Sequence, residues 1–277
     1  MTLRYVVADV FTDTALTGNQ LAVFTDGREV DDETMQKLAC EMNFSETVFV
    51  LPPEEGGHAR IRIFTPSTEL PFAGHPVLGS AFVLAAPLQL SEILLETGSG
   101  VVAVKLQREG ARIVFGWMQQ PIPTFEPFGR AEELQQVLGV RSSLPVEVYD
   151  LGPVHVYLEL GSEEEVAALT PDFVALAGFG VYVNCFAGAG RRWKTRMFAP
   201  SDGVPEDPAT GSAAGPLALH LARHGRIAFG DEIEISQGVE LKRPSRLYAR
   251  VEGSLDKVER VEVGGSAVIV ARGEFRF

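Results

Sequence analysis

One internal repeat constrains the fold of this chain more than any other feature. Residues 62–67 read Arg-Ile-Phe-Thr-Pro-Ser, and residues 196–201 read Arg-Met-Phe-Ala-Pro-Ser. Each block continues through a glutamate and a proline to a glycine, Gly74 in the first copy and Gly211 in the second. A match of this length predicts two related domains. We place them at residues 1–120 and 121–266, and the last strand, at about 267–277, is a candidate to join the first domain.

Both glycines begin an apolar stretch that predicts a buried helix. The stretches run to about residue 86 and about residue 223, and nearly every face of each helix is apolar. A helix without a polar face must be covered on all sides. The segments around both helices are rich in β-branched or alternating residues and are predicted to be strands. We therefore predict an α+β fold, in which each domain is a curved, barrel-like, mostly antiparallel sheet wrapped around a central helix.

The composition limits the classes of partner. The 277 residues carry a formal net charge of −13, which favours solubility and argues against binding to nucleic acid or to an anionic membrane. No apolar run is long enough to span a bilayer, and the first residues lead directly into a predicted strand, so a cytoplasmic location is expected. Cys40 and Cys185 have no metal or redox spacing, and we expect both to be buried packing residues.

The two helix starts are predicted to form the functional site. A helix N-terminus presents unpaired N–H groups and a partial positive charge, which suit a carboxylate or a developing enolate oxygen. Gly74 and Gly211 would let the backbone approach such a ligand closely. If the halves are related by a pseudo-twofold axis, both helix starts can point into one cleft between the domains. We therefore expect a small anionic metabolite as the ligand.

Three ionisable residues near these turns are candidates for acid and base chemistry. Glu46 has apolar neighbours on a helix-to-strand connection, and partial burial there would raise its pKa toward that of a general base near neutral pH. Asp207 precedes a proline and is expected to project at the mouth of the second turn. His75 is expected to be neutral, because a helix N-terminus disfavours its protonated form. Structural alternatives stay open: Glu46 as a solvated loop acid, His75 as a satisfied histidine, and Asp207 or Ser212 as helix caps.

Other polar residues are interpreted mainly as structural. Asn19 could contact a ligand, but a left-handed turn residue is the favoured interpretation. Glu69 and Glu206 are expected to cap a turn or to pair with Arg62 and Arg196. We find no nucleotide-binding glycine loop, so the residues indicate neither a cofactor nor a metal. No metal-ligand spacing is recognised among the remaining histidines, which are His58, His155, His220 and His224.

The sequence resembles the PhzF-like, or phenazine-biosynthesis-like, isomerases, which share the diaminopimelate epimerase fold. The motifs that carry the resemblance span nearly the whole chain, at residues 9–11 and 18–19, 43–47, 62–76, and 206–213. The resemblance implies two barrel-like domains with the active site in the cleft, a homodimer, and no cofactor or metal.

The resemblance also implies a biosynthetic reaction and its residues. In the founding activity, a dihydro-hydroxyanthranilate is isomerised when a proton moves from one ring carbon to another. The catalytic glutamate of the family falls on Glu46, and its supporting histidine, aspartate and serine fall on His75, Asp207 and Ser212. The hypothesis is a cofactor-independent isomerase of a small carboxylate-bearing metabolite, with Gly74, Gly211 and Asn19 as further substrate-binding candidates.

One departure from the wider fold superfamily bears on the mechanism. Epimerases and proline racemases of this fold use two cysteine thiols, each just before the glycine of a turn. Ala73 and Thr210 occupy these positions here. A single carboxylate that shifts a proton along one face of the substrate is therefore favoured. Two alternatives stay open: a racemase or epimerase that works without thiols, and a non-catalytic dimer that binds a metabolite.

Overall fold

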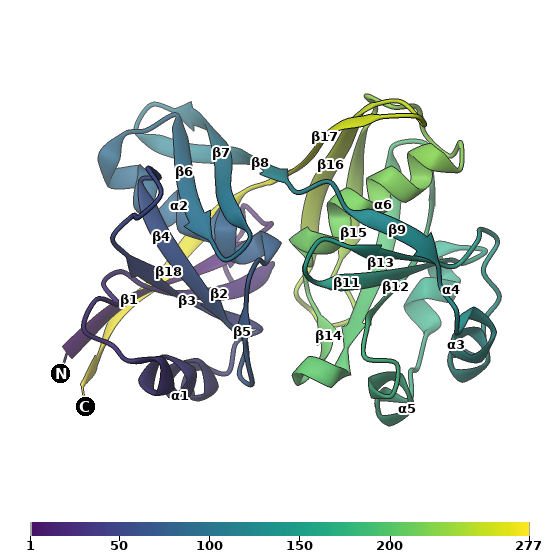
Figure 1. Ribbon diagram of the computed structural model, residues 1–277, viewed down its shortest axis with the longest axis horizontal. Coiled ribbons are helices and arrows are strands. Elements are labelled where there is room, and N and C mark those ends of the chain that lie inside the picture. Colours follow the sequence, from purple (N-terminus) through teal and green to yellow (C-terminus); the bar gives the residue numbers. More distant parts are fainter. Residues whose placement is uncertain (1, 277) are drawn as a thin grey trace. The chain divides into compact units, whose positions relative to one another are not determined.

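The computed structural model describes residues 2–276, which form two compact units (Figure 1). One unit comprises the chain up to Gln119 together with the segment from Gly264 onward, and the other is Gln120–Val263. Each unit combines helices with a sheet of mostly antiparallel strands, so the predicted α+β class is confirmed. No helix among residues 2–276 is long and apolar enough to cross a membrane.

In the first unit a curved sheet surrounds one helix. Its helices are α1 (Asp32–Met42) and α2 (Gly74–Leu88), and its strands are β1 (Thr2–Val10), β2 (Asn19–Phe24), β3 (Glu46–Leu51), β4 (Ala59–Phe64), β5 (Glu69–Leu70), β6 (Glu92–Thr97), β7 (Gly100–Glu109), β8 (Arg112–Gln120) and β18 (Ala267–Arg276). The central helix α2 contacts six strands, which are β1, β2, β3, β6, β7 and β18. Strands β1 and β18 pair along their length, which brings the two ends of the chain together (Figure 1).

The second unit has the same plan with more helices. They are α3 (Ala131–Leu138), α4 (Glu163–Ala168), α5 (Phe173–Ala177), the short 3₁₀ helix η1 (Pro200–Asp202) and the central helix α6 (Gly211–Arg223). Its strands are β9 (Thr124–Pro127), β10 (Glu147–Asp150), β11 (Val154–Glu159), β12 (Tyr182–Ala189), β13 (Arg192–Ala199), β14 (Val204–Asp207), β15 (Glu232–Gln237), β16 (Ser245–Gly253) and β17 (Val258–Gly265). Strands β11 and β16 contact α6.

The sequence repeat corresponds to a repeat of strand pairing. In the first unit β2 runs parallel to β3, β3 antiparallel to β4, and β4 parallel to β6. In the second unit β11, β12, β13 and β15 pair in the same order and directions. Arg62 lies opposite Phe49 and Arg196 lies opposite Cys185, so the register identifies equivalent positions. Phe49 and Cys185 are therefore equivalent positions. Glu46 and Tyr182 each lie three residues before them in the same strands, so they are equivalent as well.

The predicted pairing of the two repeat acids is confirmed. Arg62 and Glu69 form two parallel hydrogen bonds of 2.7 Å, and Arg196 and Glu206 form two of 2.8 Å. This fork geometry is the strongest form of an arginine–carboxylate contact. Each pair joins two antiparallel strands, β4 with β5 and β13 with β14, just before a central helix. Glu69 and Glu206 are therefore structural residues.

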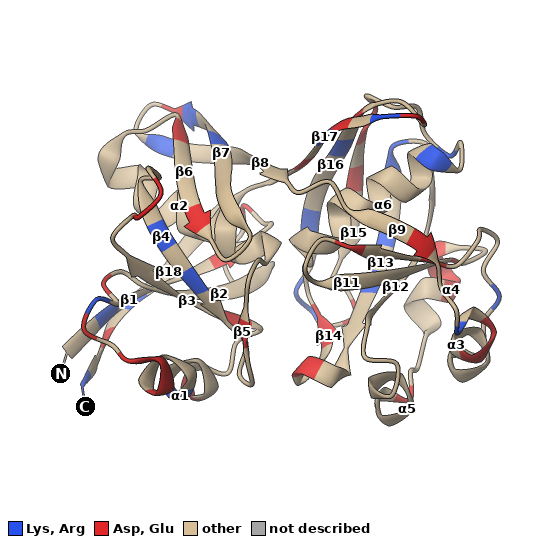
Figure 2. Cartoon of the chain, viewed as in Figure 1, with Lys and Arg blue, Asp and Glu red and all other residues tan. Residues whose placement is uncertain are grey.

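The central helix α2 is enclosed by apolar side chains. It contains no charged residue, and Figure 2 shows the charged residues on the strands and loops around it. All residues from Gly74 to Val83 are buried. A Cβ atom on Gly79 would lie 2.6 Å from Leu21 and 2.7 Å from Val10, so only glycine allows this close approach of helix and sheet. Burial on every side explains why the sequence has no polar face.

Some expectations about local structure are wrong. The proline-rich stretch at 119–129 has no periodic pattern, yet it contains β9, which pairs with β10. Strands β5 and β14 and helix α5 are too short to give a periodic signal, and they were missed. Cys185 is buried as expected, but Cys40 is exposed near the end of α1.

Candidate active site

The first unit brings three polar side chains together at the start of α2. His75 is the second residue of this helix, and its side chain is buried. Its Nδ1 atom lies 3.2 Å from Nδ2 of Asn19, and its Nε2 atom lies 3.3 Å from Oε2 of Glu46. Asn19 and Glu46 are the first residues of β2 and β3, which run parallel with Leu21 opposite Glu46. Parallel strands thus place both side chains beside the helix start.

The ring of His75 is neutral in this environment. Burial lowers its pKa to about 3, and a hydrogen bond with the backbone of Gln20 opposes this shift only in part. The predicted neutral state agrees with this direction, although burial is the larger cause and not the helix dipole. Within the described part of the chain, Nε2 makes no contact with hydrogen-bond geometry, despite its 3.3 Å separation from Glu46. A neutral ring therefore faces a carboxylate whose side chain is 15% exposed.

The favoured interpretation of Asn19 is wrong. The neighbouring Gly18 adopts the left-handed conformation, with a φ of +69°, and Asn19 begins the strand. A Cβ atom on Gly18 would lie 2.4 Å from the carbonyl oxygen of Val10, which leaves room only for glycine. The turn thus directs the buried Asn19 amide to the His75 ring. The other interpretation of Asn19, a residue that contacts a ligand, stays a prediction.

In the second unit, Ser212 occupies the position that His75 has in the first. Each is the second residue of its central helix and follows the repeat glycine. The Oγ atom of Ser212 lies 3.1 Å from Nε2 of His155, which comes from β11. This role of His155 was not predicted from the sequence. Its only signal was a histidine between two valines in a predicted strand, at the repeat equivalent of Leu21.

Asp207 lies in a turn that is held by its own neighbours. Its buried Oδ2 atom accepts a 2.6 Å hydrogen bond from the hydroxyl of Thr210. Gln237 donates to Thr210 Oγ1 at 2.9 Å and to the carbonyl oxygen of Asp207 at 2.8 Å. The Thr210 hydroxyl, at the position of a thiol in racemases of this fold, is therefore occupied within the turn.

The start of α6 bears on whether Asp207 or Ser212 is a helix cap. Thr210 is the N-cap residue, and its own side chain makes no cap hydrogen bond. The N-cap position is thus occupied by neither Asp207 nor Ser212. The carbonyl oxygen of Gly211 accepts a 2.8 Å hydrogen bond from the side chain of Gln120, which fixes the first turn.

The candidate site residues are divided between the two units. Asn19, Glu46, Gly74 and His75 belong to the first unit, whereas Asp207, Gly211 and Ser212 belong to the second. The expectation that the two helix starts line one cleft stays a prediction.

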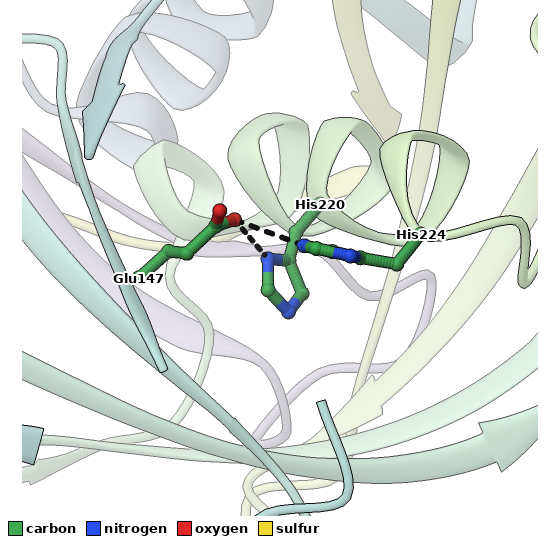
Figure 3. Close-up of side chains that lie close together, drawn as sticks. All are labelled: Glu147, His220 and His224. Atoms are coloured by element: carbon green, nitrogen blue, oxygen red, sulfur yellow. Dashed lines mark hydrogen bonds and ion pairs between the residues drawn. The ribbon is translucent and has the colours of Figure 1, made fainter. Parts of the chain in front are cut away.

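A second histidine cluster was missed in the sequence. His220 and His224 are four residues apart, a spacing that places them on one side of α6. Oε2 of Glu147 lies 3.1 Å from Nδ1 of His220 and 3.1 Å from Nε2 of His224 (Figure 3). Their ligand atoms all lie within 4.8 Å of one another, as a metal ion would require.

The surroundings of this cluster fit a hydrogen-bonded anchor better than a metal centre. The same Glu147 oxygen accepts hydrogen bonds from Arg223 at 2.7 Å and from the hydroxyl of Tyr149 at 2.9 Å. Burial raises the pKa of Glu147, but hydrogen bonds from His220, Arg223 and His224 outweigh it and hold the pKa well below its usual range. A guanidinium group already supplies the positive charge that a cation would bring. The cluster therefore ties the end of α6 to β10.

Comparisons with known proteins agree with this architecture. A family model described as phenazine biosynthesis-like protein matches residues 8–273. The trans-2,3-dihydro-3-hydroxyanthranilate isomerase of Pseudomonas aeruginosa is 54% identical over 98% of each chain. A solved structure of a predicted epimerase from the same species is 33% identical over 99% of each chain, with a TM-score of 0.84.

A more distant structure shares the fold alone. A hydroxyproline epimerase from Agrobacterium vitis is 11% identical, with a TM-score of 0.71 over 99% of this chain and 92% of that one. The epimerase-like fold predicted from the repeat and the resemblance is thereby confirmed.

Proposed function

Because the chain belongs to the family of phenazine biosynthesis-like proteins and is an isomerase of a small metabolite, we propose that Glu46 is its catalytic acid and base. The proposal rests chiefly on one observation. The partly exposed carboxylate of Glu46 lies 3.3 Å from a buried, neutral imidazole, that of His75. A protonated histidine at this distance would stabilise the carboxylate and weaken it as a base, whereas a neutral ring does not.

In the proposed reaction, the Glu46 carboxylate removes a proton from a carbon of the substrate. The electron pair of the broken C–H bond forms a new double bond to the neighbouring carbon, and the electron pair of the old double bond moves onto a second carbon. Protonated Glu46 then delivers a proton to that second carbon. Atoms and electrons balance without an oxidant, a reductant or a cofactor. Charge that develops on the substrate needs stabilisation by nearby dipoles and hydrogen bonds.

We assign the remaining site residues to binding and stabilisation. His75 is proposed to hydrogen-bond the substrate, with Asn19 holding its ring. Asp207 and Ser212 are proposed to bind polar groups of the substrate. The helix N-termini at Gly74 and Gly211 present backbone N–H groups that suit the substrate carboxylate.

The proposed substrate is trans-2,3-dihydro-3-hydroxyanthranilate, the compound for which the 54% identical relative is named. The protein is incubated with it in heavy water, while the ultraviolet spectrum, optical rotation and deuterium content are followed. An isomerase gives a spectral change, because the double bond moves, together with deuterium at carbon. Loss of optical rotation without a spectral change would identify a racemase that needs no thiols. Binding without any conversion would contradict the proposed substrate. A homodimer, which the family resemblance implies, is tested separately by sedimentation.

A further inference from the structure

Two polar side chains of β11 hold the first turn of α6. His155 and Tyr157 are two residues apart on the strand, so they lie on the same face. Nε2 of His155 lies 3.1 Å from Oγ of Ser212, and the hydroxyl of Tyr157 donates to the carbonyl oxygen of Ala213 at 2.7 Å. All of these side chains are buried.

This polar contact is not a requirement of the fold. The strand pairing makes β2 the equivalent of β11, and the residues equivalent to His155 and Tyr157 are Leu21 and Val23. At these two positions the first unit has apolar side chains, and its polar contact from β2 to the helix start comes from Asn19 instead. A buried histidine beside Ser212 therefore needs an explanation beyond packing.

Asn184 on β12 determines which nitrogen of His155 carries the hydrogen. Its Nδ2 atom carries two hydrogens and shares them among three neighbours, which are the carbonyl oxygens of Tyr182 at 3.2 Å and Val156 at 3.3 Å and Nδ1 of His155 at 3.3 Å. An amide nitrogen presents only hydrogens to its neighbours, so Nδ1 must present its lone pair. The ring is neutral, because burial lowers its pKa to about 3. Its hydrogen is therefore on Nε2, which faces Ser212.

The direction of the hydrogen bond from His155 determines what Ser212 can do. With a hydrogen on Nε2, the ring donates and the serine oxygen accepts. The ring consequently cannot act as a base toward Ser212, as the histidine of a serine hydrolase does. The serine keeps its own hydrogen for another acceptor. Backbone N–H groups of the first helical turn are donors at the same place.

We infer that His155, held by Asn184, is a positioning residue that fixes Ser212 as a hydrogen-bond donor to a carboxylate oxygen of the substrate. This inference rests on the proposed function, in which Ser212 binds substrate. His155 does not touch the substrate and acts only through the serine. Its loss leaves the hydroxyl in place but free to turn, so the effect is smaller than that of losing the hydroxyl itself.

The test compares His155→Leu with His155→Gln, using trans-2,3-dihydro-3-hydroxyanthranilate as substrate. Glutamine can present an amide N–H near the position of Nε2, whereas leucine cannot. We expect the leucine variant to raise KM about fivefold and Ser212→Ala to raise it about tenfold or more, as for a hydrogen bond to a charged group. Turnover should change less than KM, and His155→Gln should restore KM to within about twofold of the native value.

Two controls separate positioning from a structural role. Val156→Ala, a neighbouring change in the buried core of β11, should lower the thermal midpoint and leave KM unchanged. In a Ser212→Ala background, His155→Leu should have no further effect on KM. An equal effect of His155→Leu with and without the serine, or a glutamine variant as impaired as the leucine variant, would overturn the inference.

The tautomer can be measured without any variant. In the nitrogen-15 labelled native protein, ring nitrogen chemical shifts should show hydrogen on Nε2 of His155 and a lone pair on Nδ1. The reverse tautomer would overturn the inference even if the variants did not fold. Failure of the proposed function is distinguishable, because it would appear as normal turnover in Glu46→Gln, whatever the tautomer of His155.

Discussion

The starts of α2 and α6 use the same backbone plan for different chemistry. In the first unit the helix supplies the imidazole, His75, and a strand supplies the oxygen, Glu46. In the second unit a strand supplies the imidazole, His155, and the helix supplies the oxygen, Ser212. Both rings are buried and neutral, with an asparagine amide beside Nδ1. A repeated fold can thus keep its geometry while one copy presents a carboxylate and the other a hydroxyl.

The two central helices also differ in the contacts that hold the rest of each helix in place. Helix α2 is held mainly by apolar packing, and it has no charged residue. Helix α6 is tied to β10 through Glu147, which accepts hydrogen bonds from His220, Arg223 and His224. A change of charge at a side chain of the α6 network should therefore destabilise the protein more than a similar change beside the apolar contacts of α2.

The largest effect is expected where the α6 network is broken. Glu147→Gln leaves Arg223 and two histidines around a neutral amide, and removing one partner of a buried charge pair typically destabilises by about 3 kcal/mol or more. Urea unfolding should show this loss. The matched control is Glu126→Gln on the adjacent strand β9, an exposed acid whose replacement should change stability by less than about 0.5 kcal/mol. Equal losses of stability in Glu147→Gln and Glu126→Gln would contradict the view that a buried polar network holds α6.

A second prediction separates the chemistry of the two helix starts. His75→Ala should lower kcat about 100-fold, because the neutral ring beside Glu46 is proposed to stabilise the reacting substrate, a typical loss for such a donor. Ser212→Ala should act mainly on KM. Steady-state kinetics of both variants tests this. Unchanged kinetics in His75→Ala, or a loss confined to KM, would contradict the assignment to the first unit.

A third prediction concerns stability in acid. Folding holds the pKa of His75 and of His155 at about 3, below the ordinary value of 6.5. As the pH falls from 6.5 toward 3, the unfolded chain takes up protons that the folded chain does not, so the free energy of unfolding decreases. Each ring should remove about 2 kcal/mol between pH 7 and pH 5, since one pKa unit is worth about 1.4 kcal/mol.

Urea unfolding at these two pH values measures the contribution of each ring. His75→Gln and His155→Gln should each flatten the pH dependence by a similar amount. If one variant kept the full pH dependence of the native protein, folding would not lower the pKa of the ring that it replaces. The two units would then differ in the burial of these rings.

The smallest effect is expected inside α2. The hydroxyl of Ser80 is fully buried and has no hydrogen-bond partner in the described part of the chain. Ser80→Ala removes this unpaired group and should raise the free energy of unfolding by about 1 kcal/mol. A loss of stability in thermal or urea unfolding would show that the apolar description of α2 is incomplete.

Much of the fold follows from local patterns in the sequence. The repeat and the two apolar helices are strong signals, because an all-apolar helix flanked by strands allows few arrangements. Asp31 also has a local role at the start of α1, where its side chain accepts a hydrogen bond from the backbone N–H of Thr34. The short strands β5, β9 and β14 give no periodic signal and were missed.

The site was less predictable than the fold, because side-chain contacts depend on register. Asn19 follows Gly18, and only the strand pairing shows that its amide reaches His75 and does not form the turn. His155 is 57 positions from Ser212 in sequence, and its contact requires the placement of β11 beside α6. The pair His220 and His224 could have been recognised from its four-residue spacing alone.

The central claim is that Glu46 transfers the proton, and its direct test is deuterium incorporation by Glu46→Gln in heavy water. Glutamine keeps the shape of the side chain but cannot act as a base, so incorporation at carbon should fall about 1000-fold or more, within the range for general acid–base catalysis. Binding of the substrate, measured by calorimetry, should remain. The matched control Glu69→Gln alters a structural acid of the same unit and should exchange at nearly the native rate. Native rates of deuterium incorporation in Glu46→Gln would contradict the account.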